Sequence, residues 1–157
     1  MHLFESLTRT LPLGLVAALA LGAVACGEEY TYSADSFFLE NWESDYTKIS
    51  DCAQSPTHSG DYVRVFADAA SAPAYAGDAE VPEGGVIMKA QYSDDECSDL
   101  GSITAMRKGP EGTSETGNWE WQRISGDGSV DQEGQLSACV DCHAGCELND
   151  YRCQSPD

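Results

Sequence analysis

One short segment of the chain has residue types and spacing suited to chemistry: Cys139-Val140-Asp141-Cys142-His143. This C-x-x-C-H pattern is the attachment signature of a c-type haem. One helical turn directs the two sulfurs at the vinyl groups of a porphyrin, and the adjacent imidazole reaches the iron. A C-x-x-C pair also occurs as a disulfide or in a metal site, but no second ligand pair has a spacing typical of zinc. The segment therefore predicts one covalent haem c, with Cys139 and Cys142 as attachment points and His143 as the iron ligand.

Five further cysteines bear on the redox environment: Cys26, Cys52, Cys97, Cys146 and Cys153. With Cys26 set aside as a lipidation site, six cysteines remain, an even number typical of an oxidising compartment. Parity alone fits either three disulfides or two disulfides plus a haem-linked pair. If the C-x-x-C pair holds haem, Cys146 and Cys153 could close a short loop and leave Cys52 to pair with Cys97. Other connectivities stay open at this point.

The first 25 residues have the features of a bacterial export signal. Their apolar stretch, residues 11–25, would span roughly 22 Å as a helix, short of the ~30 Å hydrocarbon core of a bilayer. Small residues lead into Cys26 as in a lipoprotein signal, so we expect Cys26 to be acylated and to anchor the chain. Residues 26–35 then form a tether, and residues 36–157 form one domain. We expect this domain at a bacterial membrane, facing the periplasm or the cell surface, with the outer membrane favoured. The alternative is plain secretion.

The chain is strongly acidic, with 27 Asp and Glu residues against 8 Lys and Arg, and a formal net charge of -19 in 157 residues. A nucleic-acid-binding protein needs an excess of basic side chains to contact phosphates, so this balance excludes that class. It also disfavours electrostatic docking on anionic lipid. Trp42, Trp119 and Trp121 supply bulk for a modest hydrophobic core.

The hydrophobic pattern predicts an α+β fold: a domain rich in antiparallel β-sheet, with an N-terminal helix and a C-terminal haem-bearing helix. The predicted elements are a helix over 36–50, strands over 62–66, 86–92, 102–107 and 119–124, and a helix near 135–146. In the first strand, Arg64 shares a face with Tyr62 and Phe66, and the two intervening valines lie on the other face.

Several segments together resemble the cytochrome P-460 family of periplasmic mono-haem proteins. They are residues 62–66, 82–89, 106–108, 116–121 and 139–145. The Trp-Glu-Trp run combined with a late C-x-x-C-H is the most specific part. The resemblance spans about residues 42–151. It implies a sheet-rich, often dimeric protein whose five-coordinate haem has an open side facing the sheet.

Catalytic members of this family oxidise hydroxylamine to nitrous oxide and carry a lysine joined covalently to the porphyrin edge. The resemblance places that lysine at Lys89, and it places Arg64 over the open face of the haem. From the residues alone, Lys89 shares a strand face with Ile87 and Gln91, which does not settle the direction in which it points. A strand lysine that reaches solvent and an edge-strand arginine paired with an acid are the alternatives for these two residues.

Hydroxylamine oxidation releases protons, so the site needs a base within hydrogen-bond reach. Glu133 is the candidate, because it lies shortly before the predicted haem helix. His58, Met88 and Met106 are the candidates for a sixth iron ligand, although none has a diagnostic context.

Three functions are therefore carried forward. The first is a hydroxylamine oxidoreductase that passes electrons to an acceptor cytochrome and forms a homodimer. The second is a protein of the cytochrome c′-β type, which binds nitric oxide or transfers electrons and usually lacks the lysine. The third is a haem-free, disulfide-rich lipoprotein that serves as an interaction module, and it predicts three disulfides. The presence of Lys89 favours the first over the second.

Overall fold

The computed structural model describes residues 35–38, 40–58, 61–77 and 79–153. The predicted signal segment, the lipidation site Cys26 and all but the last residue of the tether lie outside the described residues. None of the helices that are described is long and apolar enough to cross a membrane.

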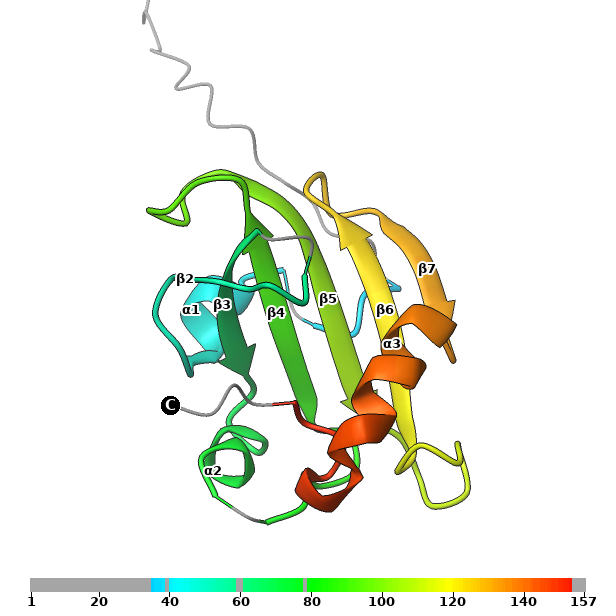
Figure 1. Ribbon diagram of the computed structural model, residues 1–157. Coiled ribbons are helices and arrows are strands. Elements are labelled where there is room, and N and C mark those ends of the chain that lie inside the picture. The colour runs from blue at the N-terminus through cyan, green and yellow to red at the C-terminus, as the bar shows by residue number, and fades with distance from the viewer. Residues whose placement is uncertain (1–34, 39, 59–60, 78, 154–157) are drawn as a thin grey trace, which may run out of the picture.

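An antiparallel sheet forms the centre of the fold, and the described residues contribute seven strands to it. The strands are β1 (Thr47–Lys48), β2 (Ala53–Gln54), β3 (Tyr62–Ala67), β4 (Val86–Tyr92), β5 (Leu100–Lys108), β6 (Trp119–Ser125) and β7 (Val130–Gly134). Their order in space is β1-β3-β4-β5-β6-β7, and β2 also pairs with β3. From β3 to β7 each strand pairs with the next one along the chain (Figure 1). The predicted sheet-rich α+β fold is confirmed.

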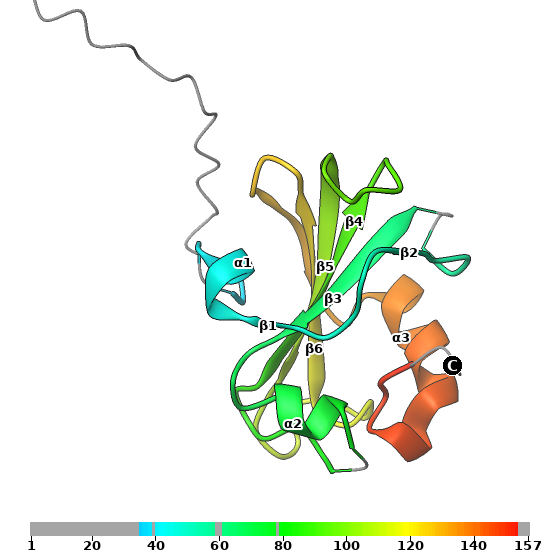
Figure 2. The same ribbon diagram turned by 90° about the vertical axis from the view of Figure 1, so that its left-hand side faces the viewer.

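Short helices lie on both sides of this sheet. The helices are α1 (Trp42–Asp45), α2 (Ala72–Tyr75), α3 (Ser137–His143) and the 3-10 helix η1 (Ala144–Asn149). Figure 2 shows α1 and α3 on opposite sides of the sheet, with α2 near one end of it. The C-terminal helix that carries the C-x-x-C-H segment is therefore confirmed, and it covers a different face from the N-terminal helix.

The structure differs from the sequence prediction in one helix and one strand. The helix expected over 36–50 is limited to α1, because Thr47 and Lys48 pair with Ala67 and Phe66 of β3 and become an edge strand. Strand β7 was not predicted, because its five residues include one large apolar side chain and are mostly exposed. Without alternating apolar residues, such a strand leaves no periodic signal.

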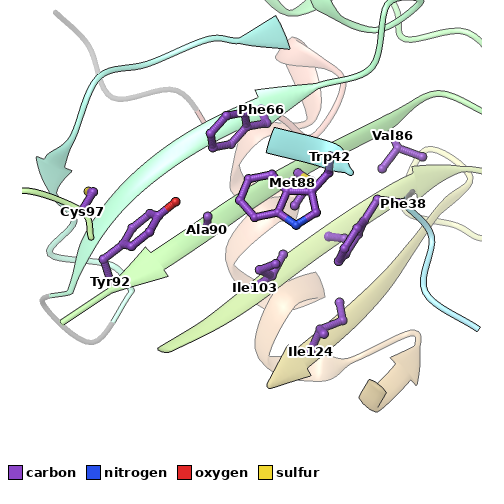
Figure 3. Packing of buried hydrophobic residues seen from close by; sticks show 11 residues of the cluster. Phe38, Trp42, Phe66, Val86, Met88, Ala90, Tyr92, Cys97, Ile103 and Ile124 are labelled. Carbon is purple, nitrogen blue, oxygen red and sulfur yellow. The ribbon is translucent and has the colours of Figure 1, made fainter. Parts of the chain in front are cut away.

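The sheet has two faces of different character, set by the alternation of side chains along each strand. The core face carries the larger apolar cluster, which Figure 3 shows gathered on one side of the strands: Phe38, Trp42, Phe66, Val86, Met88, Ala90, Tyr92, Cys97, Ile103, Ala105 and Ile124. Trp42 is 1% exposed, and its ring meets those of Phe38 and Phe66 edge-on, with centroids 6.4 Å and 4.8 Å apart. The opposite side, called the cavity face here, carries a smaller cluster that includes Val65, Ile87, Met106, Trp119 and Trp121.

Two disulfides occur among the described cysteines, and both have the predicted pairing. Cys52 joins Cys97, and Cys146 joins Cys153. The first lies on the core face, where Cys97 belongs to the buried cluster. The second closes the segment that follows α3.

Candidate functional site

A cavity of about 250 Å³ lies between α3 and the cavity face of the sheet. Strands β3 to β6 contribute Val65, Lys89, Met106 and Trp121, among others. Cys139, Cys142 and His143 line the cavity from α3. The C-x-x-C-H segment thus lies over the cavity face, which carries the smaller of the two apolar clusters.

The imidazole of His143 is held in a defined orientation. Its Nδ1 lies 2.6 Å from the backbone carbonyl oxygen of Tyr151. A carbonyl can only accept, so Nδ1 donates the proton and Nε2 keeps a free lone pair for a metal. Burial lowers the pKa of His143, which keeps the ring in the neutral form that metals bind. The ring of Trp121 packs edge-on against it, with centroids 6.1 Å apart.

The Tyr151 carbonyl is presented by an unusual backbone conformation. Asp150 and Tyr151 are consecutive non-glycine residues with φ of 50° and 57°, in the left-handed region. Such a conformation costs free energy and persists where the surroundings over-determine it. Gly117 allows the ring of Tyr151 to lie against the backbone at that position, because a Cβ on residue 117 would lie 2.6 Å from the ring.

Buried polar contacts supply that constraint around Asp150. Its carboxylate forms a salt bridge with Lys108, and the two side chains are 7% and 11% exposed. Its other carboxylate oxygen accepts from the backbone N–H of Val81 at 2.9 Å, and its carbonyl oxygen accepts from Nε1 of Trp119 at 3.0 Å. Arg152, which is 2% exposed, donates to the carbonyl oxygens of Ala74 and Ala79. The side of the cavity that orients His143, called the proximal side here, is therefore built from four separate segments of the chain.

The two cysteines of α3 are free thiols, whereas the other described cysteines are paired. Burial raises the pKa of the Cys139 thiol, so it is protonated at neutral pH. Free thiols that face a common cavity are the groups that add to the vinyl groups in c-type haem attachment. Among the described residues, no three His, Cys, Asp or Glu side chains are grouped as a metal site by themselves.

A buried polar atom of the cavity wall also points to a bound group. Nε1 of Trp121 is buried and has no hydrogen-bond partner. A buried donor left unpaired costs about 1–3 kcal/mol, so native structures rarely leave one. A cofactor with acceptor groups, such as the propionates of haem, would satisfy it. The free thiols, the oriented His143 and this unpaired donor together fit a haem.

Lys89 points into the same cavity rather than to solvent. Its Nζ lies 3.0 Å from Nε2 of His58, which belongs to the segment between β2 and β3. Burial lowers the pKa of Lys89. Burial also lowers the pKa of His58 to about 4, and the positive charge of Lys89 acts in the same direction. The ring of His58 is therefore neutral at neutral pH.

In a comparison with protein-family models, residues 39–152 match the model for cytochrome P-460. The chain belongs to the cytochrome P-460 family. Membership implies a c-type haem protein, in agreement with the donor set on α3. A search of curated proteins found no match.

Arg64, predicted from the cytochrome P-460 resemblance to lie over the open haem face, is on the opposite face of the sheet. Its register partner Ala90 belongs to the core-face cluster, whereas the neighbouring Val65 pairs with Lys89 and lines the cavity. The guanidinium donates to the carbonyl oxygens of Cys97 and Glu96. Strand alternation therefore separates Arg64 from the cavity, and its observed contacts secure the loop that carries Cys97.

Glu133 is likewise not brought into the cavity. It pairs across the strands with Gln122 and accepts a hydrogen bond from Nε2 of that residue at 3.0 Å. Gln122 in turn accepts from the backbone N–H of Phe37 on the core face. Being close in sequence to the haem helix does not place this carboxylate near His143, because α3 and Glu133 lie toward different faces.

Strand alternation separates the two methionines among the candidates for a sixth iron ligand. The side chain of Met88 belongs to the core-face cluster and is 1% exposed. Met106 and His58 lie at the cavity, and His58 is in contact with Lys89.

Sequence reasoning missed several residues of this cytochrome P-460 site. Arg123 lines the cavity beside Cys139, and it could have been found because it follows Trp119 and Trp121 at strand spacing. The contribution of Tyr151 is a backbone carbonyl, which has no signature in a sequence. The pairing of Asp150 with Lys108 joins residues 42 positions apart, so no local pattern indicates it.

Proposed function

We propose that this protein is an exported mono-haem cytochrome that oxidises hydroxylamine to nitrous oxide at an open iron site. The observation that carries the proposal is the position of Lys89. This side chain faces the cavity lined by Cys142 and His143, where a lysine would reach the edge of a haem attached to α3. A lysine joined to the porphyrin edge distinguishes the hydroxylamine-oxidising members of the family from those of the cytochrome c′-β type.

The haem-binding roles follow from the donor set. Thioether bonds from Cys139 and Cys142 would attach one haem, and Nε2 of His143 would bind its iron. The hydrogen bond from Nδ1 to the Tyr151 carbonyl fixes the ring orientation and increases the basicity of the ligand. When bound, the haem supplies the iron that holds hydroxylamine and accepts its electrons.

The overall reaction sets what the protein must provide. Two hydroxylamine molecules yield one nitrous oxide and one water, and they release four protons and four electrons. The cavity must hold a small nitrogenous ligand and give its protons a way out. The electrons must pass to a separate one-electron acceptor, for which a cytochrome is the appropriate class. A lipid anchor at Cys26 would keep the domain at the membrane surface facing such a partner, and we propose a homodimer as its assembly.

The proposal is tested by producing the full chain in a host with c-type haem maturation. We expect a strongly red-shifted ferrous Soret band, and we expect hydroxylamine to yield nitrous oxide with reduction of an added acceptor. Lys89→Met should lose both the red shift and the nitrous oxide. Lys48→Met is the matched control, because Lys48 is an exposed lysine paired with Asp51 on the edge strand.

Other outcomes identify the other functions. An ordinary c-type ferrous spectrum in the wild type, without nitrous oxide, would indicate gas binding or electron transfer of the cytochrome c′-β type. A colourless product, with a control cytochrome correctly matured in the same host, would indicate the haem-free module.

A further inference from the structure

The contact between His58 and Lys89 joins two ionisable groups inside the cavity, and the proposed function uses only one of them. Their side-chain nitrogens are 3.0 Å apart. A lysine ammonium has donors only, so Nε2 of His58 accepts from Nζ of Lys89 and is itself unprotonated. His58 is therefore placed to receive a proton from the one nitrogen expected to form a bond to the cofactor.

The surroundings of this pair leave His58 as the available base. The described residues that line the cavity include no Asp or Glu side chain. The ionisable groups that act on His58 are Lys89 from β4, His143 from α3 and Asp61 from its own segment. Lys89 is committed to the new bond and His143 to the iron. Asp61 does not line the cavity, and its charge favours a proton on His58.

Local hydrogen bonds hold His58 in position. The backbone N–H of His58 donates to the carbonyl oxygen of Ser55 at 3.3 Å, and that of Asp61 donates to the carbonyl oxygen of His58 at 3.0 Å. The N–H of Ser55 donates to the carbonyl oxygen of Asp61 at 2.8 Å, which closes the turn. These hydrogen bonds connect the backbone of His58 to Ser55 and Asp61, next to the first residue of β3.

We propose that His58 is the general base for the covalent attachment of Lys89 to the porphyrin edge. The inference rests on the proposed function for the bond itself, and it adds the residue that takes up the proton. His58 Nε2 accepts a proton from Lys89 Nζ as the carbon–nitrogen bond forms.

The step balances when a peroxide serves as the oxidant. Nζ begins as an ammonium and ends as a secondary amine bonded to a ring carbon that has lost its hydrogen. This change releases three protons and two electrons. Hydrogen peroxide takes both electrons and two of the protons, its O–O bond breaks, and two water molecules form. The third proton goes to His58, which later passes it to solvent.

An imidazole suits this position better than a carboxylate would. A carboxylate beside Lys89 would stabilise the ammonium by its negative charge and oppose the loss of protons from Nζ that bond formation requires. As the nitrogen bonds to an aromatic carbon it becomes a far stronger acid than an alkyl ammonium. The pKa of His58, about 4, then matches its task more closely than the usual histidine value would.

The experiment follows cross-link formation and not enzyme activity. The full chain is matured without oxidant, and one equivalent of hydrogen peroxide is added to the ferric protein. The readouts are the mass of the haem peptide that contains Lys89 and the growth of the red-shifted Soret band. We expect His58→Gln to slow the reaction about a hundredfold, the lower range for loss of a general base. Thr57→Val alters the same turn without touching an ionisable group, and it should react as the wild type does.

A rescue experiment separates a base from a merely structural residue. Added imidazole should restore cross-linking in His58→Ala, and raising the pH should accelerate it in both variants, because hydroxide then removes the proton. The wild-type rate should fall as the pH drops toward the pKa of His58. Slow cross-linking that neither imidazole nor higher pH restores would assign His58 a structural role and overturn the proposal.

The remaining outcomes distinguish failure of the His58 proposal from failure of the proposed function. Cross-linking of His58→Gln at the wild-type rate overturns the role of His58 and leaves the proposed function intact. A wild-type protein that binds haem but forms no bond to Lys89 refutes the cross-link in the proposed function. If the variants fail to bind haem, the pH profile of the wild-type rate still tests the proposal, since a rate that stays constant well below pH 4 excludes His58 as the base.

Discussion

The two faces of the sheet are built from the same strands but serve different purposes. On the core face, Trp42 and Phe38 lie over the strands among the buried apolar side chains (Figure 3). On the cavity face, α3 lies over the sheet, and Lys89 and His58 meet inside a cavity. Dense apolar packing on one side supplies stability, and the other side is left free to hold a cofactor.

Neighbouring residues in β4 lie on different faces of the sheet. Met88 is 1% exposed in the core-face cluster, and Lys89 faces the cavity. A shift of one residue in strand register would exchange the two side chains. On the opposite face, the disulfide joins Cys52, between β1 and β2, to Cys97 in the β4–β5 connection.

The largest expected effect comes from opening the core face. Trp42→Ala should lower the free energy of unfolding by about 3–5 kcal/mol, because it removes a buried aromatic ring and leaves a cavity. Thr104→Ala, across from Lys89 on the cavity face, should cost less than about 1 kcal/mol. Urea unfolding of the haem-loaded protein measures both. Equal losses of unfolding free energy would contradict the view that the core face supplies most of the stability.

The two disulfides sharpen the same comparison. In the chain-entropy model, removing Cys52–Cys97, with a sequence separation of 45, should cost about 4 kcal/mol, and removing Cys146–Cys153, with a separation of 7, about 2.5 kcal/mol. The smaller loss should nevertheless be the one that alters the haem spectrum, because that bond closes the segment holding Tyr151. Paired serine variants, compared by urea unfolding and ferric absorption, test this. A spectral change confined to the Cys52–Cys97 variant would reverse the assignment.

Breaking the salt bridge on the proximal side should combine a stability loss with a change at the iron. Asp150→Asn leaves Lys108 without its carboxylate and should cost about 3 kcal/mol. It should also shift the reduction potential, because the Tyr151 carbonyl is then less firmly held against His143. Adding Lys108→Met should recover part of the stability but not the potential. Recovery of both would mean that the turn does not orient the ligand.

The smallest expected effect is on the pH dependence of stability. The pKa of His58 is about 4 in the folded protein and near 6.5 in the unfolded chain. The unfolded state thus binds the extra proton first, and the free energy of unfolding should decrease as the pH falls from about 6.5 to about 4. His58→Gln should reduce that decrease. Urea midpoints at pH 7 and pH 4.5 provide the measurement, and parallel losses in both proteins would contradict the pKa.

Sequence patterns anticipated local features well and distant ones poorly. The strand over 86–92 and the two faces of the 62–66 segment followed from alternation, and both are confirmed. The N-terminal helix was predicted too long, because pairing of Thr47 with Ala67 across the sheet outweighs the helical spacing of apolar residues. Arg64 was assigned to the site from the family resemblance, and Glu133 from its place shortly before the haem helix. Because side chains alternate along a strand, each of the two lies on the core face and not on the cavity face.

The sequence by itself determined the haem-binding residue types of the site and the alternation of side chains along the strands. A thiol pair followed by an imidazole on one helical turn is a local feature, and so is the alternation that separates Met88 from Lys89. Only the tertiary structure decided which face α3 covers, that His58 meets Lys89, and that a backbone carbonyl orients His143. Those outcomes depend on contacts between residues far apart in the chain. Their free energy comes from packing whole segments together, which no short pattern of residues encodes.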